Sequence, residues 1–472
     1  MRKGATVYFA GSVVSQASAL LRYVILARLL GAEQLGLAAM LILTAQFFDS
    51  ISDTGSDRFI IQDADGDSPR VQGVVQVVLA ARGVLIAVAL LLLAAPLSGL
   101  YREADLRPSL IALGLAPLIA GFVHLDLRRL QRVADFRAEG AATIVSETLS
   151  LIVTVAAAIM VRDHTAVIYG LVARAASLVV MSHVLAKRPY RWALGRAEGV
   201  RFSVFAFPLF LNGLLLFFGS QGDRLIVGSG LGAEALGHYS AVLLLAFYPT
   251  SMLARFVSGI HLPQLARARA SPVEFGIESE RLGSRTLVLT LGIVAGFTLV
   301  APFATPLLYG AKFAEPLQIF ALLAVVQAAR FMRFWPTNLA VSIGRSAIVM
   351  QNNIARMVAI PVALAANFQF HSLEAIVSGF IVGELVALAT ALWLLKREGV
   401  VDLKRELGRV GLFCLGGLSA VSAAWALQQG AIPVATAAVG VGLVVGLALL
   451  VTERATFAEV RQVIVRRIGG PG

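Results

Sequence analysis

The chain has 472 residues, of which 58% are hydrophobic and 14% are charged, and its mean hydropathy is +0.81. This composition excludes an ordinary soluble globular protein. A net charge of +12 would suggest nucleic acid in a soluble protein, but here it predicts basic loops beside membrane helices, and no nucleic-acid partner is expected. The single cysteine, Cys414, excludes an internal disulfide.

Apolar windows of about 20 residues, the length with which a helix crosses a bilayer, recur along the chain. The first follows Met1-Arg2-Lys3 and continues without a signal-peptide cleavage site, so a retained helix is expected. The predicted fold class is an all-α integral membrane protein with about 14 transmembrane helices. The windows form groups of six, six and two: 6–28, 35–56, 73–97, 109–127, 141–161 and 165–186; 202–226, 237–258, 284–308, 315–338, 346–366 and 372–395; 408–427 and 432–451.

A short sequence occurs twice between apolar windows. Gly31-Ala32-Glu33 and Leu35-Gly36 return as Gly232-Ala233-Glu234 and Leu236-Gly237, at an offset of 201 residues. Each copy is typical of a tight turn between two membrane helices. The offset stays near 201–211 through both groups of six. The sequence therefore predicts two homologous lobes in parallel repeat: 1–190 with helices 1–6, 191–400 with helices 7–12, and 401–472 as two appended helices with a cytoplasmic tail.

The distribution of Lys and Arg between the windows predicts the orientation. If the N-terminus is cytoplasmic, the inner segments hold 27 basic residues. The outer segments then hold five: Arg28, Arg102, Arg107, Arg162 and Lys312. Basic residues favour cytoplasmic loops, so both termini are predicted to be cytoplasmic.

Eight further arginines fall inside the predicted helices. A guanidinium near the bilayer centre is costly and usually faces a bundle interior or a wet cavity. Arg82, Arg224 and Arg255 lie within about two turns of a helix end, where they either reach the headgroups, pair locally or join the deeper arginines in a cavity, with Arg82 and Arg255 nearer its cytoplasmic mouth. The deeper ones are expected to face the interior: Arg22, Arg174, Arg330, Arg333 and Arg356. Several share a helix face with polar residues, although such stripes more often bond neighbouring helices: Ser15 and Ser18 with Arg22, Gln327 with Arg330 and Arg333, Asn352 with Arg356.

Intramembrane acids are fewer than these arginines. They are Asp49, Asp53, Glu147, Asp223 and Glu384, so the arginines exceed them by three. Buried positive charge is strongly unfavourable without a counter-ion, and Arg suits bidentate phosphate contacts. The sequence therefore predicts a cationic cavity that accepts a phosphate or pyrophosphate group. The five acids are also candidates for proton or sodium coupling.

The sequence gives little support to catalysis. It contains no Walker loop, no His-Glu-x-x-His, no Gly-x-Ser-x-Gly and no Cys-x-x-Cys pair. Its six histidines lack ligand spacing, so neither a metal nor a cofactor is expected. The outer loops, at most about eleven residues long, are too short for a catalytic domain. Prolines within the windows predict kinked helices: Pro117, Pro208, Pro249, Pro302, Pro306, Pro336 and Pro361.

Two segments carry a family resemblance. Residues 27–36, Ala-Arg-Leu-Leu-Gly-Ala-Glu-Gln-Leu-Gly, followed by Asp53-Thr54-Gly55, resemble the opening of the Wzx-type polysaccharide flippases. These belong to the multidrug/oligosaccharidyl-lipid/polysaccharide (MOP) exporter superfamily. Residues 220–228, Ser-Gln-Gly-Asp-Arg-Leu-Ile-Val-Gly, running into Leu231–Ser240, resemble the corresponding signature of the second half. Resemblance in layout extends over most of 1–396, and His238 departs from the aliphatic residue that is commoner there.

The resemblance implies an inverted-V bundle of two six-helix lobes around a central cavity, plus two extra helices. It implies alternating-access movement of an undecaprenyl-pyrophosphate-linked oligosaccharide across the bacterial inner membrane, for exopolysaccharide, capsule or O-antigen assembly. Polymerase and chain-length proteins are candidate partners beside the polyprenyl-linked glycan and the bilayer. Two alternatives stay open: a lipid II flippase, and an integral-membrane glycosyltransferase or polysaccharide ligase. A cation-coupled drug exporter of the same superfamily would have mainly acids in its cavity, and Arg22 on the first helix argues against that function.

Overall fold

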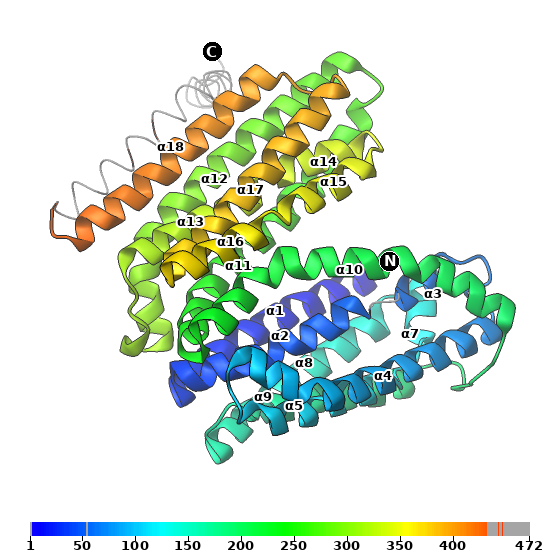
Figure 1. Ribbon diagram of the computed structural model, residues 1–472. Coiled ribbons are helices and arrows are strands. Elements are labelled where there is room, and N and C mark those ends of the chain that lie inside the picture. The colour runs from blue at the N-terminus through cyan, green and yellow to red at the C-terminus, as the bar shows by residue number, and fades with distance from the viewer. Residues whose placement is uncertain (1, 53–54, 432–441, 443–445, 447–472) are drawn as a thin grey trace, which may run out of the picture. The chain divides into compact units, whose positions relative to one another are not determined.

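The computed structural model describes residues 2–52, 55–431, 442 and 446, and the regular elements in this part of the chain are helices (Figure 1). Twelve helical segments of the described residues are long and apolar enough to cross a membrane. They match twelve of the predicted windows. Asp53 and nearly all of the fourteenth window, 432–451, lie outside the described residues.

The fold consists of two compact units. Unit 1 contains the described residues up to Ala241 together with Leu308–Phe313, and unit 2 contains Val242–Leu307 and the described residues from Ala314 onward. The long α10 belongs to unit 1, where it packs on α2 and α4. The predicted three-part division at 190 and 400 remains a prediction.

Unit 1 is built from the first ten helices, and α11 begins in it. α8 packs between α1 and α9, while α2 lies beside α1 (Figure 1). The helices are α1 (Arg2–Leu30), α2 (Ala32–Ile51), α3 (Ser56–Gln62), α4 (Pro69–Tyr101), α5 (Leu106–Leu113), α6 (Leu115–Ala120), α7 (Asp126–Arg132), α8 (Arg137–Val161), α9 (Ala166–Val184) and α10 (Arg196–Leu231), followed by α11 (Ala233–Ala268).

Unit 2 holds most of α11 and the remaining helices. α13, α17 and α18 pack together (Figure 1) around a core that contains Phe331, Trp335 and Phe413. α18 corresponds to the first of the two appended windows, so this window shares the unit's core. The helices are α12 (Pro272–Tyr309), α13 (Leu317–Met332), α14 (Phe334–Ser342), α15 (Ser346–Arg356), α16 (Ala359–Phe370), α17 (Leu373–Arg397) and α18 (Leu403–Gln428); the 3₁₀ helix η1 (Ala311–Phe313) lies in unit 1.

The fourth window differs from its prediction as one span over 109–127. The structure breaks it at Gly114 into α5 and α6 and ends it at Ala120. Pro117 has no N–H to donate to the Leu113 carbonyl, which accounts for the interruption. The segment Leu106–Ala120 is therefore a shorter apolar helix than the twelve full-length candidates.

The two repeated turns have the same backbone. Gly31 has φ 82° and ψ −179°, and Gly232 has φ 91° and ψ −177°. The turns also pack reciprocally, because a Cβ on Gly36 would collide with the carbonyl of Ala233, and one on Gly237 with that of Ala32. Gly237 is the repeat equivalent of Gly36, and Ala233 is the repeat equivalent of Ala32, so the two contacts are equivalent to each other. The α1–α2 and α10–α11 turns are related by a local pseudo-two-fold axis within unit 1.

A second correspondence links the two units at an offset of 209 residues. Arg162 ends α8 in the left-handed conformation (φ 60°), and His371 ends α16 in the same way (φ 44°). Gly170 then packs against Thr154, as Gly379 packs against Ala363 at the same offset. α8 of unit 1 is therefore equivalent to α15 and α16 of unit 2 taken together, and α9 is equivalent to α17.

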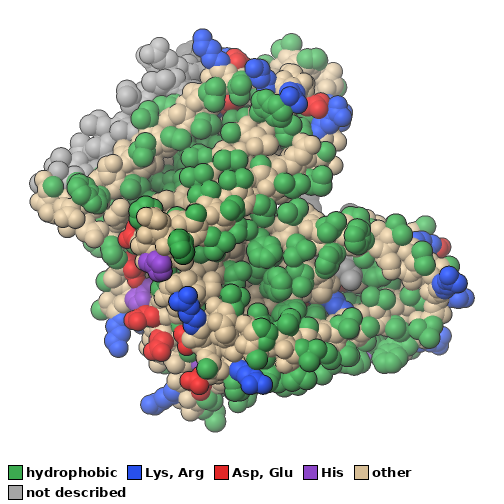
Figure 2. Space-filling view, viewed as in Figure 1, with side chains coloured by type: hydrophobic (Ala, Val, Ile, Leu, Met, Phe, Trp, Pro, Cys, Tyr) green, Lys and Arg blue, Asp and Glu red, His purple; other side chains and the backbone are tan. Residues whose placement is uncertain are grey.

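The molecular surface agrees with a multi-pass membrane protein. On the face shown in Figure 2, charged side chains gather toward the ends of helices, and hydrophobic side chains cover most of the surface between them. Large apolar side chains are exposed on several spans, including Leu92, Met160 and Phe303. Contiguous apolar surface of this kind marks a membrane-facing protein.

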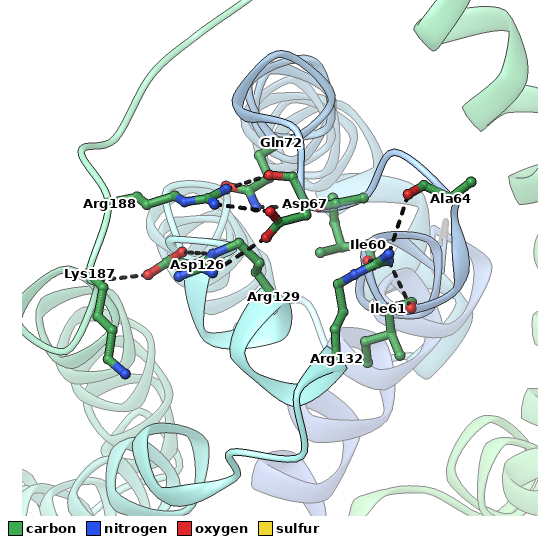
Figure 3. Close-up of polar contacts among 11 residues, drawn as sticks. Ile60, Ile61, Ala64, Asp67, Gln72, Asp126, Arg129, Arg132, Lys187 and Arg188 are labelled. Carbon is green, nitrogen blue, oxygen red and sulfur yellow. Dashed lines mark hydrogen bonds and ion pairs between the residues drawn. The ribbon is translucent and has the colours of Figure 1, made fainter.

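A polar network ties the ends of several unit 1 helices together outside the membrane spans (Figure 3). Asp67 accepts hydrogen bonds from Arg188 and from Arg129, which also pairs with Asp126 at 2.5 Å. The bond from Arg188 holds the pKa of the Asp67 carboxyl below its usual range. Arg132 donates to the carbonyls of Ile60, Ile61 and Asp63, which satisfies the C-terminal end of α3.

Candidate functional site

Three predicted site residues meet in the membrane part of unit 1. Glu147 of α8 accepts a hydrogen bond from Arg174 Nε of α9 at 2.7 Å, and its other oxygen lies 3.8 Å from Arg22 Nη2 of α1. Arg22 and Glu147 are buried, whereas the Arg174 side chain is 48% exposed. We call these three side chains the unit 1 cluster. Its formal charge is +1.

Serines hold the unit 1 cluster in place. Arg22 donates to Ser150 Oγ at 2.9 Å, and Ser150 in turn donates to the Gly170 carbonyl at 2.8 Å. Ser15, which shares a face of α1 with Arg22, donates to Glu147 at 3.2 Å. The polar face expected on the first helix therefore meets Glu147 and Ser150 of α8. The α1–α8 contact brings Arg22 to the carboxylate, and the α8–α9 contact brings Arg174.

Four predicted site residues meet in unit 2. Glu384, near the middle of α17, is 1% exposed and lies within ion-pair distance of three arginines. The distances are 3.2 Å to Arg330 Nε, 2.9 Å to Arg333 Nε and 2.5 Å to Arg356 Nη2. Arg333 also donates to Asn352 Oδ1 at 3.3 Å. We call Glu384 and these three arginines the unit 2 cluster, with a formal charge of +2.

Two kinked spans, each divided into two helices by a short interruption, bring the arginines of the unit 2 cluster together. α13 ends at Met332 and α14 begins at Phe334, so Arg333 is at the break. α15 ends at Arg356 and α16 begins at Ala359. Pro336 and Pro361 cause the breaks, because neither can donate to the carbonyl four residues earlier. Arg330 and Arg356 lie in the last turns of α13 and α15, where a cation is favoured by the helix dipole.

The two clusters occupy equivalent helices with opposite polarity. At the offset of 209 residues, Glu147 of α8 corresponds to Arg356 of α15. Arg174 of α9 corresponds to a position one residue before Glu384 of α17. The carboxylate thus stands on the first helix of the pair in unit 1 and on the second helix in unit 2. The ion pairs thus lie at equivalent places in the two units, with their charges exchanged.

Asp223 and Arg224 form a separate buried group beside the repeated turns. Asp223 accepts from the hydroxyl of Tyr239 at 2.9 Å, and Arg224 donates to the hydroxyl of Tyr23 at 2.7 Å. Arg224 also donates to Ser240 and Gln221. The tyrosines were not among the expected site residues. The repeat offset could have indicated one of them, since Tyr23 and Arg224 are 201 positions apart and lie at the local axis.

The remaining predicted residues are at least partly exposed. The expectation that Arg82 and Arg255 lie within two turns of a helix end is wrong, because α4 and α11 extend further than the apolar windows and place both about 13 residues from the nearer end. Arg82 donates to Ser52 Oγ at 2.8 Å and pairs at 3.2 Å with Asp49. The Asp49 side chain is 67% exposed. Arg255 is exposed on α11 and donates to the Ser251 carbonyl of its own helix. Asp49 and Arg174 also line a cavity of about 100 Å³ among α2, α4, α6 and α9.

The side chains of the two clusters are of the kind that binds anions. Among the residues that the structure describes, no group of three His, Cys, Asp or Glu side chains is placed to hold a metal ion. Both clusters instead combine one carboxylate with two or three guanidinium groups. Guanidinium groups bind phosphate and carboxylate through paired hydrogen bonds, so both clusters are suited to an anionic headgroup.

Comparison with solved structures shows the fold. The lipid II flippase MurJ in an inward closed conformation superposes with a TM-score of 0.72 at 11% identity, covering 96% of this chain and 99% of that one. An inward-facing multidrug resistance MATE family transporter of the MOP superfamily gives a TM-score of 0.65 at 14% identity, covering 83% of this chain and 96% of that one. The chain therefore has the fold of a MOP-superfamily transporter.

Sequence comparison adds the family. The succinoglycan biosynthesis transport protein ExoT of Rhizobium meliloti (strain 1021) is 25% identical over 310 residues, which cover 64% of this chain. The match spans 61% of that relative's length. These relatives are transport proteins and not enzymes. The family profile described as "Polysaccharide biosynthesis protein" matches residues 25–318, and the chain belongs to this family of membrane transporters.

Proposed function

We propose that the chain is a flippase for a lipid-linked oligosaccharide, and that it moves an undecaprenyl-pyrophosphate-linked repeat unit from the cytoplasmic to the outer leaflet of the bacterial inner membrane. The observation that carries the proposal is the pair of arginine–carboxylate clusters within membrane helices, each with an excess of positive charge. A transported diphosphate offers oxygens that guanidinium groups bind through paired hydrogen bonds. Family membership supports the saccharide, since the matched relative is a succinoglycan biosynthesis transport protein.

In the proposed cycle, the arginines of the two clusters contact the diphosphate in turn. Arg82 and Arg255 draw the headgroup in from the cytoplasmic side. The lipid tail stays in the bilayer while the two lobes alternate in access. With the cytoplasm electrically negative, each negative charge that moves outward gains about 2.3 kcal/mol per 100 mV.

The intramembrane acids are assigned secondary roles in this proposal. Asp49, Glu147 and Asp223, together with Asp53, remain candidates for proton or sodium coupling. Glu384 is the weakest of the candidates, because an incoming cation must compete with three guanidinium groups. Polymerase and chain-length proteins of the same pathway are proposed partners.

The experiment is deletion of the gene, followed by leaflet-resolved analysis of undecaprenyl-linked oligosaccharides and of secreted polysaccharide. The expected result is a complete repeat unit that accumulates facing the cytoplasm, with polymer lost and cells viable. Complementation with the wild-type gene should restore the polymer, and complementation with the Arg330→Ala/Arg356→Ala variant should not.

Two outcomes contradict the proposal. Persisting polymer with loss of viability and accumulation of lipid II would identify a peptidoglycan-precursor flippase instead. Sugar transfer by the purified protein, without any movement of lipid-linked sugar in vesicles, would identify a glycosyltransferase or ligase. The proposed glycan cargo is wrong in either case.

A further inference from the structure

The segment that joins α9 to α10 lies along α4 in unit 1. It covers residues 187–196 and has no regular secondary structure until α10 begins at its last residue. A Cβ on Gly73 of α4 would lie 2.9 Å from the Ala193 Cβ and 3.2 Å from the Arg191 carbonyl oxygen. The glycine therefore lets this segment, which we call the strap, pack directly on α4.

Polar contacts hold the first part of the strap in place. The Lys187 N–H donates to Asp126 Oδ2 at 2.6 Å, and Arg188 Nη2 donates to Asp67 Oδ2 at 3.1 Å (Figure 3). The Arg188 carbonyl also bonds to His124 Nε2 at 3.0 Å. These bonds fix one half of the strap and the packing on α4 fixes the other, so its outward side chains have defined directions.

The strap presents apolar and basic side chains away from α4. Trp192 is 61% exposed and Leu194 is 86% exposed, and they lie on either side of Ala193, which packs on α4. This alternation is typical of an extended segment. Arg191 and Arg196 are exposed as well. The strap contains four basic residues and no acidic residue, so its outer surface is both apolar and cationic.

The acids of the neighbouring α3–α4 loop pair with other arginines. Asp63 and Asp65 pair with Arg201 of α10 at 3.2 Å and 2.8 Å. Asp67 pairs with Arg188 at 3.1 Å, on the side of the strap that is bound to the protein. The three acids of this loop are thus engaged by arginines other than the two exposed ones of the strap.

The predicted spans put the strap at the level of the membrane surface. The apolar window predicted for α4 begins at residue 73, so Gly73 marks the edge of the hydrocarbon region at the end that is predicted to be cytoplasmic. Tryptophan is enriched at this depth, and arginine can reach the headgroups from it. Anionic lipids of the cytoplasmic leaflet attract basic residues that lie next to membrane spans.

We propose that the strap is a site for anionic phospholipids: Trp192 and Leu194 insert into the cytoplasmic leaflet, and Arg191 and Arg196 bind the headgroup phosphates there. This inference does not depend on the transported cargo. Size favours the leaflet over a protein partner, because two apolar side chains do not supply the roughly 800 Å² per partner of a stable protein interface. The bilayer already surrounds the adjoining spans.

The test uses the purified full-length protein with a single cysteine in a Cys414→Ser background. Leu194→Cys is labelled with the fluorophore NBD, and the protein is reconstituted in nanodiscs of equal parts phosphatidylglycerol and phosphatidylcholine. Lipids that carry a nitroxide on the acyl chain quench NBD where it reaches the bilayer. We expect the label at Leu194→Cys to lose most of its fluorescence. A label at Ala64→Cys, on the exposed α3–α4 loop, should keep most of its fluorescence.

The role of the arginines is tested by placing the nitroxide on one of the two lipids at a time. One arginine near the surface favours an anionic lipid about fivefold, so phosphatidylglycerol should quench the Leu194→Cys label with a preference of about fivefold or more. Adding Arg191→Gln and Arg196→Gln should remove most of this preference. Arg191→Lys with Arg196→Lys keeps the charge and should retain it. Arg107→Gln, at the predicted outer end of the same unit, is the matched control and should leave it unchanged.

Several outcomes would overturn the lipid site. Quenching at Leu194→Cys no stronger than at Ala64→Cys would place the strap in water. If the label is then shielded in native membranes but not in nanodiscs, a protein partner covers the strap instead. Equal quenching by the two lipids would contradict the preference for anionic headgroups. A preference that survives both Arg→Gln changes, or that Arg107→Gln lowers equally, would reflect the net charge of the protein and not the strap.

Discussion

At the scale of the residue, charge reversal distinguishes the two halves of the molecule. Glu147 and Arg356 occupy equivalent positions in the two repeats, and each reaches an oppositely charged partner on the next helix. One substitution at such a place leaves a buried charge without its partner, which costs about 3–5 kcal/mol. A paired change of sign at such a place therefore costs less than a single one, and unit 2 has one more arginine around its acid than unit 1.

The Arg330→Ala/Arg356→Ala variant should reduce polysaccharide export at least ~10-fold, because each charge-assisted hydrogen bond to a phosphate is worth about 1.5–3 kcal/mol. Arg356→Lys should be intermediate, since it keeps the charge but loses the planar fork. Export is measured in the deletion strain at equal amounts of membrane-inserted protein. Arg345→Ala, which breaks the exposed pair with Glu398, is the control and should export normally. Normal export by the double variant would contradict the cationic site.

His124 predicts a pH dependence of stability in unit 1. It lies in the segment between α6 and α7, where its Nδ1 accepts from the Asp126 N–H and its Nε2 bonds to the Arg188 carbonyl. Burial lowers the pKa of the ring, helped by the charges of His183 and Arg129, while the Arg188 carbonyl and Asp126 oppose the shift. The neutral ring is thus the folded form. Its contribution to stability is complete above the ordinary pKa of about 6.5 and is lost as the pH falls from there toward the folded pKa.

The measurement is the unfolding temperature of the detergent-solubilised protein between pH 7.5 and 5.5. Wild type should lose stability on acidification, and His124→Gln should lose less. Burial also lowers the pKa of His164, so a part of the pH dependence should survive in the variant. An unchanged pH profile in His124→Gln would exclude this histidine as the cause.

At the scale of the element, the repeated turns bring two helix pairs into close contact. Gly36→Ala and Gly237→Ala each place a methyl group against a backbone carbonyl of the facing turn, and such overpacking costs about 1–3 kcal/mol. We expect both variants to lower the unfolding temperature of the purified protein. Gly99→Ala is the matched control, because Gly99 lies in α4 with no neighbour near the added methyl group. Alanine is favoured over glycine in a helix, so this control should be neutral or slightly stabilising. Unchanged stability in both turn variants would contradict the close approach.

Element-level prediction from the sequence succeeds where one physical signal dominates. Hydropathy alone predicts twelve of the full-length spans, and the Gly31 and Gly232 copies predict the two turns. Hydropathy does not predict the interruption at Gly114 and Pro117, because the apolar residues on both sides keep the average hydropathy of the window high. Pro336 and Pro361 indicated kinks, but the sequence could not show that both kinks lie at one glutamate. That convergence depends on packing between helices that are distant in the sequence: Arg330 and Glu384, for example, are more than fifty positions apart.

At the scale of the whole molecule, the distribution of basic residues predicts an orientation that determines the direction of transport. With both termini in the cytoplasm, the loop that contains Ala64 is inside and the loop that contains Ala104 is outside. Cys414 is the single cysteine, so a Cys414→Ser background permits one new cysteine at a time. Both alanines are exposed on their loops and suit this replacement.

We expect a membrane-impermeant maleimide to label Ala104→Cys in intact spheroplasts and to label Ala64→Cys only after permeabilisation. The reverse labelling pattern would show that the protein has the opposite orientation in the membrane. The distinction bears on the energy source, because a diphosphate diester that leaves a negative cytoplasm moves two charges down the potential and gains about 4.6 kcal/mol at 100 mV. In the predicted orientation, export therefore runs with the potential, and a collapse of the potential should slow it. In the inverted orientation the protein would face the cytoplasm with its sparsely charged end, and the positive-inside asymmetry of the sequence would lack a physical reason.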